Sequence, residues 1–308
     1  MGSTRSVITV GNFDGVHLGH RALLAEARRL ADQAGGAKVV AMAFAEHPLT
    51  ALKPEQAPLK LTDTAQRMDA LLGAGADVIE WLEPSPRILT LGPRQFVERA
   101  VEMFRPVGWV EGPDFRFGRG RAGDVQALHA LGSELGFDVH IVEPVRVVLH
   151  DKSICPVSSS LVRWLVAHGR VNDARLCLGR PVAIRGPVVR GEQRGRTIGF
   201  PTVNLDTAGR QLPADGVYAG QALIGDRTYA AAISVGVKPT FGRLARAFEA
   251  FILDFDGDVY GQMLEVRVLH WLRDQWAFPS VDSLTRQMER DVASIRRLVE
   301  STLSGAAA

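Results

Sequence analysis

The chain has 308 residues, 46% of them hydrophobic and 23% charged, which is ordinary for a globular protein with room for two domains. Its 36 basic and 34 acidic side chains nearly cancel, so the charge favours neither nucleic acid nor an anionic membrane as a partner. No apolar run reaches the ~18 residues of a membrane span, and the N-terminus lacks the apolar core of a signal peptide. Cys155 and Cys177 show no metal-ligand spacing and are expected as reduced thiols, so we expect a cytoplasmic protein.

Short apolar runs alternate with helical patterns in the first half of the chain. Strands are expected at 6–10, 38–44, 77–81, 107–111 and 138–144, and helices at 19–34, 62–74, 93–104 and 124–135. This alternation predicts an α/β domain in which helices cover both faces of a parallel sheet. Ligands of such a sheet bind beyond the carboxyl ends of its strands.

The segment from Gly11 to His20, with the sequence GNFDGVHLGH, joins the first expected strand to the first expected helix. A helix N-terminus attracts phosphate through its unpaired N–H groups, and glycines let the backbone come close to a ligand. His17 and His20 are placed to donate hydrogen bonds to phosphate oxygens. The segment has neither the Lys-Ser/Thr ending of a P-loop nor the spacing of a dinucleotide fold, and we interpret it as a nucleoside-triphosphate site.

The pattern changes after two short helices expected at 158–168 and 171–178. Glycine and proline recur beyond Gly179, and strands with a period of two are expected at 248–255 and 263–269, which predicts a small closed barrel. A final helix from about residue 280 carries an apolar stripe expected to pack on the barrel, made of Leu284, Met288, Val292, Ile295 and Val299. The expected domains are 1–180 and 181–308.

A glycine-rich and arginine-rich segment from Gly191 to Asn204 carries the second chemical signal. Thr202 and Asn204 point the same way on an extended strand, so their oxygens are placed to hold Mg²⁺ together with phosphate and water. Glu249 lies on an apolar strand face, where a carboxylate can serve as a general base. A solvated turn and a glutamate paired with an arginine are the structural alternatives for these residues.

Together these segments resemble the prokaryotic bifunctional riboflavin kinase/FAD synthetase family over about residues 6–300. Further matches lie at Asp114–Gly118, Gly120-Arg121, Ser158–Arg163, Leu178–Pro181, Gly195–Asn204, Gly216–Tyr218, Lys238–Phe241, Asp254–Gly257 and Tyr260-Gly261. The resemblance implies a Rossmann-like nucleotidyltransferase domain with a His-x-Gly-His motif, followed by a riboflavin-kinase-like β-barrel with a terminal helix. It also implies phosphorylation of riboflavin to FMN and adenylylation of FMN to FAD.

The resemblance implies roles for individual residues, with ATP as co-substrate and Mg²⁺ as cofactor. His17, His20 and Glu249 are the expected catalytic residues, and Thr202 and Asn204 the expected Mg²⁺ ligands. The expected ATP and phosphate contacts are Gly11, Asn12, Phe13, Asp14, Gly15, Gly19, Ser158, Ser159, Arg163, Gly191, Arg194, Gly195, Arg196 and Gly199. The flavin-binding candidates are His47, Pro48, Asp114, Phe115 and Trp276.

Several positions depart from the family pattern. Ala45 and Glu46 replace an acid and a proline before His47, and Leu161 replaces the first of two arginines. Leu161 and Arg163 lie about 200° apart on a helix, so the loss of one leaves the other in place. In the barrel, Ser234, Phe251 and Gln275 replace a usual Asn, His and Glu.

Competing interpretations remain open. One is a riboflavin kinase whose first domain is a degenerate binding or regulatory module, and another is a flavin-binding or nucleotide-binding protein without turnover. Class I aminoacyl-tRNA synthetases share the His-x-Gly-His motif, but this chain has no second lysine-rich loop of their kind. The expected partners are riboflavin, FMN and ATP, with no nucleic acid and no membrane, in a monomer or weak homo-oligomer.

Overall fold

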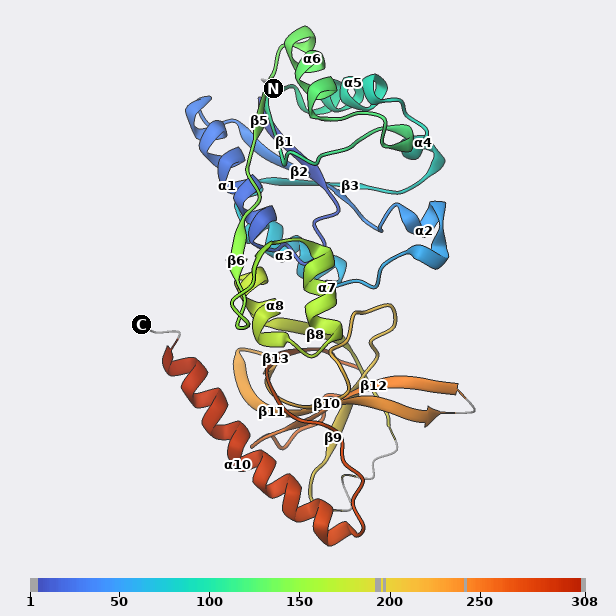
Figure 1. Ribbon diagram of the computed structural model, residues 1–308, viewed down its shortest axis with the longest axis vertical. Coiled ribbons are helices and arrows are strands. Elements are labelled where there is room, and N and C mark those ends of the chain that lie inside the picture. The colour runs from blue at the N-terminus through green and yellow to red at the C-terminus, as the bar shows by residue number, and fades with distance from the viewer. Residues whose placement is uncertain (1–4, 192–194, 196–197, 241–242, 306–308) are drawn as a thin grey trace. The chain divides into compact units, whose positions relative to one another are not determined.

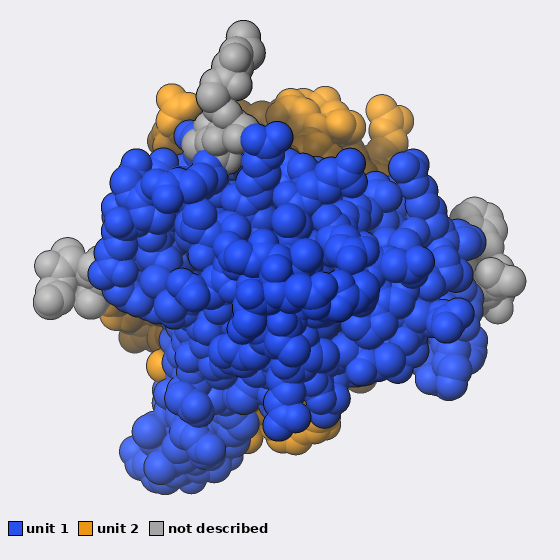
Figure 2. Space-filling view, turned by 90° about the horizontal axis from the view of Figure 1, so that it is seen from above, with its two compact units in different colours: residues 1–59, 63–159 blue, residues 60–62, 160–308 orange. Residues whose placement is uncertain are grey.

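A computed structural model describes residues 5–191, 195, 198–240 and 243–305 of the chain. Its contacts form two compact units, residues 1–59 with 63–159 and residues 60–62 with 160–308, which Figure 2 colours separately. Residues 160–180, placed in the first domain by the sequence boundary, belong by contact to the second unit. The boundary at residue 180 itself stays a prediction.

The first unit is built on a five-stranded sheet with the order β3-β2-β1-β4-β5, in which all neighbours are parallel (Figure 1). Its strands are β1 (Ser6–Gly11), β2 (Lys38–Phe44), β3 (Val78–Leu82), β4 (Pro106–Glu111) and β5 (Asp138–Ile141). The five expected strands are therefore confirmed, and β5 ends three residues earlier than expected.

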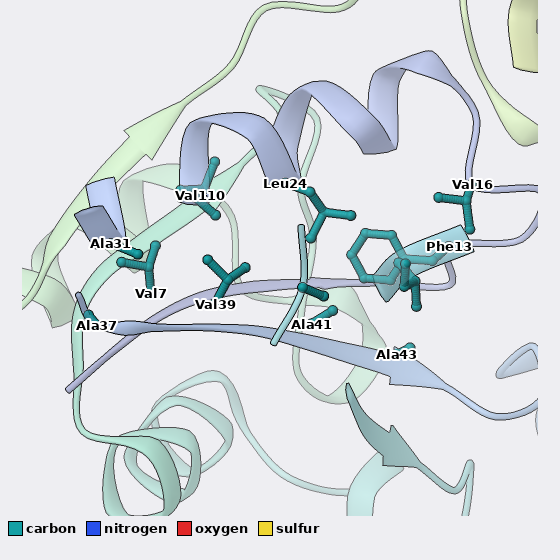
Figure 3. Close-up of a cluster of buried hydrophobic side chains, with 13 residues drawn as sticks. Val7, Phe13, Val16, Leu24, Ala31, Ala37, Val39, Ala41, Ala43 and Val110 are labelled. Atoms are coloured by element: carbon teal, nitrogen blue, oxygen red, sulfur yellow. The ribbon is translucent and has the colours of Figure 1, made fainter. Parts of the chain in front are cut away.

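Helices cover both faces of this sheet, as the alternation predicts. On one face Val7, Val39 and Ala41 pack with the helices α1 (Leu18–Gln33) and α3 (Thr64–Gly73), as Figure 3 shows for part of the cluster. On the other face Ile8 and Val40 pack with α5 (Pro93–Phe104) and α6 (Val125–Leu135). Burial on both faces explains why these strands read as continuous apolar runs.

Short elements complete the first unit and carry no periodic signal in the sequence. They are α2 (Leu49–Leu52), η1 (Pro54–Gln56), α4 (Pro86–Leu89), η2 (Arg119–Arg121), and the hairpin of β6 (Arg146–Val148) with β7 (Ile154–Pro156). The two helices expected next are present as α7 (Ser159–Ala167) and α8 (Val171–Leu178).

The second unit contains a closed six-stranded barrel with the order β10-β11-β12-β9-β8-β13, which confirms the expected barrel. Its strands are β8 (Val182–Val189), β9 (Thr202–Leu205), β10 (Gly216–Ile224), β11 (Arg227–Thr240), β12 (Arg243–Ile252) and β13 (Met263–Arg273). The strand expected at 248–255 stops at Ile252, because the chain turns at Asp254, whose φ is 57°.

The long final helix α10 (Val281–Gly305) runs beside the barrel (Figure 1). Ile295 and Val299 are buried in a cluster with Ala219 and Leu269, so the expected packing of the apolar stripe on the barrel is confirmed for its second half. Among the described residues, no helix combines the length and apolar character needed to cross a membrane.

Candidate active sites

The loop between β1 and α1 is fixed by two buried anchors. Phe13 and Val16 have φ angles of 49° and 38°, a left-handed conformation that is costly for a branched residue such as valine. Both side chains are fully buried beside Leu24 (Figure 3), and this apolar burial offsets the strain. The Phe13 ring therefore belongs to the core, and any contact of Phe13 with phosphate is through its backbone.

His17 and His20 lie together at the start of α1. His17 is the N-cap residue of the helix, and its Nδ1 accepts a hydrogen bond of 3.4 Å from the His20 backbone N–H. The two rings stack with their centroids 3.6 Å apart. Since Nδ1 of His17 is an acceptor, the neutral ring carries its proton on Nε2, which is a suitable donor to a phosphate oxygen.

Other loop residues of the predicted triphosphate site surround this pair. A Cβ added at Gly19 would lie 3.1 Å from the His17 ring, so glycine gives the histidine its space. Ser159 donates from Oγ to the Asp14 carbonyl over 2.8 Å, which ties the start of α7 to the loop. In the part of the chain that the structure describes, the buried Oδ1 of Asn12 has no hydrogen-bond partner, as expected of an atom that contacts a ligand.

The other residues predicted to contact phosphate or flavin in the first domain differ in how exposed they are and in what they contact. Ser158 is exposed, and Arg163 is half-buried on α7, within the second unit. His47 accepts at Nδ1 from the Leu49 backbone N–H over 3.1 Å and so shapes the turn that begins at Pro48. Asp114 is exposed and Phe115 stacks on Phe117. Their roles toward phosphate and flavin stay predictions.

Sequence patterns missed a buried carboxyl at the end of β4. Glu111 is 2% exposed, and its Oε1 accepts hydrogen bonds from the Val10 backbone N–H at 2.8 Å and from Trp109 Nε1 at 2.9 Å. Burial raises the pKa of Glu111 well above its ordinary value, while the two hydrogen bonds lower it. The carboxyl thereby joins β4 to β1 directly before the triphosphate loop.

The barrel brings the second set of predicted residues together. Asn204 on β9 and Ser234 on β11 are both paired with Glu249 on β12. Two residues further along β12, Phe251 is paired with Thr202 of β9. Paired residues on antiparallel strands present their side chains on the same face, so these groups form one surface. Phe248 and Ala250 point the opposite way into the barrel and are fully buried.

The glycines of the 191–204 segment leave space for this surface. A Cβ at Gly191 would lie 2.3 Å from Nδ2 of Asn204, and a Cβ at Gly195 would lie 2.2 Å from the Phe200 carbonyl oxygen. Gly199 has a φ of 85°, which suits glycine. Arg194 and Arg196 lie outside the described residues.

A cavity of about 510 Å³ opens over this surface, between the barrel and the first half of α10. Its lining includes Gly195, Ile198, Phe200, Thr202, Val217, Ala232, Ser234, Glu249, Phe251, Arg273, Val281, Leu284, Met288, Asp291 and Val292. The volume suits a ligand of vitamin size, and the mixture of apolar walls with few polar groups is typical of small-molecule sites. The α10 stripe therefore lines the cavity with its first half and packs on the barrel with its second.

Two polar contacts that sequence patterns did not reveal shape the cavity. Arg273 from β13 donates to Asp291 of α10 at 2.7 Å, and both side chains are nearly buried. Gln275 donates from Nε2 to Ser234 Oγ at 3.1 Å. Trp276 lies between β13 and α10 with its ring 4.8 Å from the Arg273 guanidinium, and its flavin role stays a prediction.

A second cavity of about 560 Å³ is lined by Pro201–Val203, Ile252 and Phe255–Tyr260. Thr202 lines this cavity and the first one. The two cavities therefore approach each other at the residue that the sequence predicts as a metal ligand.

A parallel α/β unit with a His-x-Gly-His loop, followed by a barrel with a carboxylate-lined cavity, is the architecture of a two-site transferase of phosphate-containing groups. The FAD synthetase family model matches residues 2–158, and the riboflavin kinase family model matches residues 178–299. The chain belongs to the family of bifunctional riboflavin kinase/FMN adenylyltransferases.

Relatives of that description include a protein of Escherichia coli K12, 33% identical over 94% of this chain and 91% of its own length. The relative from Pseudomonas fluorescens is 35% identical over 95% of this chain and 92% of its own length. A solved structure from Streptococcus pneumoniae, described as a macrolide-efflux protein, is 33% identical and superposes with a TM-score of 0.86. It covers 96% of this chain and 95% of its own.

Proposed function

We propose that this chain makes FAD in two ATP-dependent steps, phosphorylation of riboflavin to FMN and adenylylation of FMN to FAD. The observation that carries the proposal is the pairing of Glu249 with Asn204 over a cavity of vitamin size, in a chain whose other unit holds a His-x-Gly-His loop. The alternative of a kinase with a degenerate first domain finds no support in the FAD synthetase match, which runs through residues 2–158.

In the kinase step, the apolar cavity receives riboflavin and the second cavity receives ATP. The two approach each other at Thr202, which supports phosphate transfer between ligands in these cavities. Glu249 accepts the proton of the riboflavin 5′-hydroxyl, whose oxygen attacks the γ-phosphorus. The bond from that phosphorus to the β,γ-bridging oxygen breaks, and ADP leaves.

Thr202 and Asn204 fit a Mg²⁺ ion bound mainly through substrate. Their side chains lie on the same face of β9, Thr202 lines both cavities, and the absence of a Cβ at Gly191 leaves room for the Asn204 amide. Mg²⁺ prefers oxygen ligands and keeps several waters beside phosphate, so one or two protein ligands are enough. When bound, the ion supplies charge neutralisation to the phosphates. Across the described ranges, no cluster of three or more His, Cys, Asp or Glu side chains is arranged to hold a metal.

In the adenylylation step, an FMN phosphate oxygen attacks the α-phosphorus of ATP, and pyrophosphate leaves as the α,β-bridging bond breaks. His17 Nε2 and the N-terminus of α1 donate to the phosphate oxygens as negative charge develops on them. The strained, core-anchored loop holds these donors in place before the substrate arrives, which is where an in-line displacement gains most of its rate.

The near-zero net charge supports a protein that acts on small molecules without nucleic acid. A cytoplasmic location and a monomeric or weakly associating state are part of the same proposal. Light scattering across a protein dilution series tests the assembly state.

The test is a product assay in which purified protein receives Mg²⁺ and ATP with either riboflavin or FMN. Flavin chromatography should show FMN and FAD from riboflavin, and FAD from FMN. FMN alone, even when FMN is the substrate supplied, would overturn the second activity. Tight flavin binding without either product would favour a binding protein.

A further inference from the structure

Arg67 is a buried arginine inside the first unit, with 5% of its surface exposed. Asp63 and Gln66 form a capping box that fixes the start of α3 directly before it. The guanidinium points away from solvent, toward the loops that follow β1 and β2, and no phosphate-site motif includes it.

The Arg67 guanidinium donates hydrogen bonds to three backbone carbonyls. Its NH1 donates to Asn12 O at 2.9 Å and to Phe44 O at 2.8 Å, and its NH2 donates to Ala45 O at 2.6 Å. Asn12 belongs to the triphosphate loop, whereas Phe44 and Ala45 lead into the turn at His47. The fork therefore joins two loops that leave neighbouring parallel strands at the same end of the sheet.

The charge of Arg67 is held in a mostly dry setting. Burial lowers the pKa of this guanidinium, and the nearby charges of Asp14, Glu46 and Asp63 raise it. Its guanidinium carbon lies 4.9 Å from the centre of the Trp81 ring. A buried cation is costly unless its donors are paired, and the three carbonyls pair with both terminal nitrogens of the guanidinium.

We propose that Arg67 is a positioning residue for adenylyl transfer, which fixes the triphosphate loop against the 44–45 segment and places a fixed positive charge beside the loop. This inference rests on the proposed function of that loop. Arg67 binds the backbone carbonyl of residue 45 and not its side chain. The presence of Ala45 in place of the family's usual acid therefore does not remove this hydrogen bond.

The experiment compares Arg67→Met and Arg67→Lys with Arg28→Met as the matched control. Arg28 also joins parts of the first unit, donating to Gly75 O at 2.9 Å and to Asp77 Oδ2 at 2.6 Å. Those contacts lie before β3, at the amino end of the sheet, so their loss should spare the loop. Each variant is assayed for both reactions well below its unfolding temperature, with rates corrected for the folded fraction.

Arg67→Met should lower kcat for FAD formation from FMN by about 10²-fold, since small displacements of catalytic groups cost that much. Arg67→Lys keeps the positive charge but cannot bond all three carbonyls as the guanidinium does. Its kcat for FAD formation should therefore lie between those of Arg67→Met and the wild type. Kinase activity of both variants, and adenylylation by Arg28→Met, should stay within about twofold of the wild type. A purely structural role would reduce the folded fraction without changing the corrected kcat.

Corrected adenylylation by Arg67→Met within about threefold of the wild type would overturn the inference. If that variant does not fold, the same threshold applied to a folded Arg67→Lys decides the question. An equal loss in Arg28→Met would also overturn it. A wild-type chain that makes no FAD from FMN would instead overturn the proposed function, and this inference with it.

Discussion

Asn204 and Glu249 lie directly opposite each other on the antiparallel strands β9 and β12. This register places the amide and the carboxylate on the same face of the sheet, where Glu249 lines the 510 Å³ cavity. A slip of one residue would turn both side chains to the other face of the sheet, so strand pairing itself defines the site.

Replacing Glu249 by glutamine should lower kcat for FMN formation by about 10²- to 10⁴-fold, because an amide cannot accept the hydroxyl proton. FMN adenylylation by the same variant should be unchanged. The control is Glu265→Gln, which removes a carboxylate that pairs with Arg267 on β13 of the same barrel. Equal loss of both activities in Glu249→Gln would contradict the division of labour, and both are measured by flavin chromatography.

Gly191→Ala should impair the kinase by moving Asn204. The added methyl group would lie 2.3 Å from the Asn204 amide nitrogen, so the amide must shift. We expect kcat/KM for riboflavin phosphorylation to fall at least about tenfold, with a raised Mg²⁺ requirement. A Cβ at Gly73 meets no heavy atom within 4 Å, so Gly73→Ala is the matched control. An unchanged Mg²⁺ titration of Gly191→Ala would argue against Asn204 as a ligand.

His17→Asn separates two roles of one residue. Asparagine is among the best N-cap residues, so the start of α1 should persist while the imidazole donor is lost. FAD formation from FMN should fall about 10²-fold with riboflavin phosphorylation unchanged. His17→Ala should lose the cap as well, with a further ~1 kcal/mol of stability. Wild-type FAD synthesis by His17→Asn would remove His17 from the phosphate site.

Glu111 should make the stability of the first unit depend on pH. Because its folded-state pKa lies well above the ordinary 4.5, its contribution to stability is complete below that value and is lost as the pH rises toward the folded pKa. Glu111→Gln keeps an oxygen acceptor for Val10 and Trp109 but does not titrate. The unfolding temperature of the wild type should therefore fall relative to that of the variant as the pH rises above 4.5. Parallel curves over that range would contradict this account.

The sequence predicts well what depends on local pattern. Strands such as β1 and β2 are predicted because burial of both faces makes them continuous apolar runs. The helix α1 is predicted because apolar residues such as Ala27 and Ala31 recur at helical spacing before two glycines. The barrel could be predicted in kind, from period-two segments such as 263–269, although most of its strands could not be placed.

The rest depends on pairs that are distant in sequence. Glu111 meets Val10 across 101 residues, and Arg67 meets Asn12 across 55, so neither contact has a local signature. Ser234 lies at the cavity because the register of β11 pairs it with Glu249. Arg273 lies there because it contacts Asp291 of α10, which closes one side of the cavity. A charged side chain on the buried side of α3 was the one available clue to Arg67.

The central claim, that one chain carries two separable sites linked by FMN, is tested most directly by mixing two variants. Glu249→Gln and His17→Asn are incubated together with riboflavin, ATP and Mg²⁺, and FAD is measured by flavin chromatography. Each variant alone should form almost no FAD from riboflavin, whereas the mixture should form it, because FMN made by one variant is adenylylated by the other. A mixture that accumulates neither FMN nor FAD, while Glu249→Gln still converts added FMN, would contradict the account.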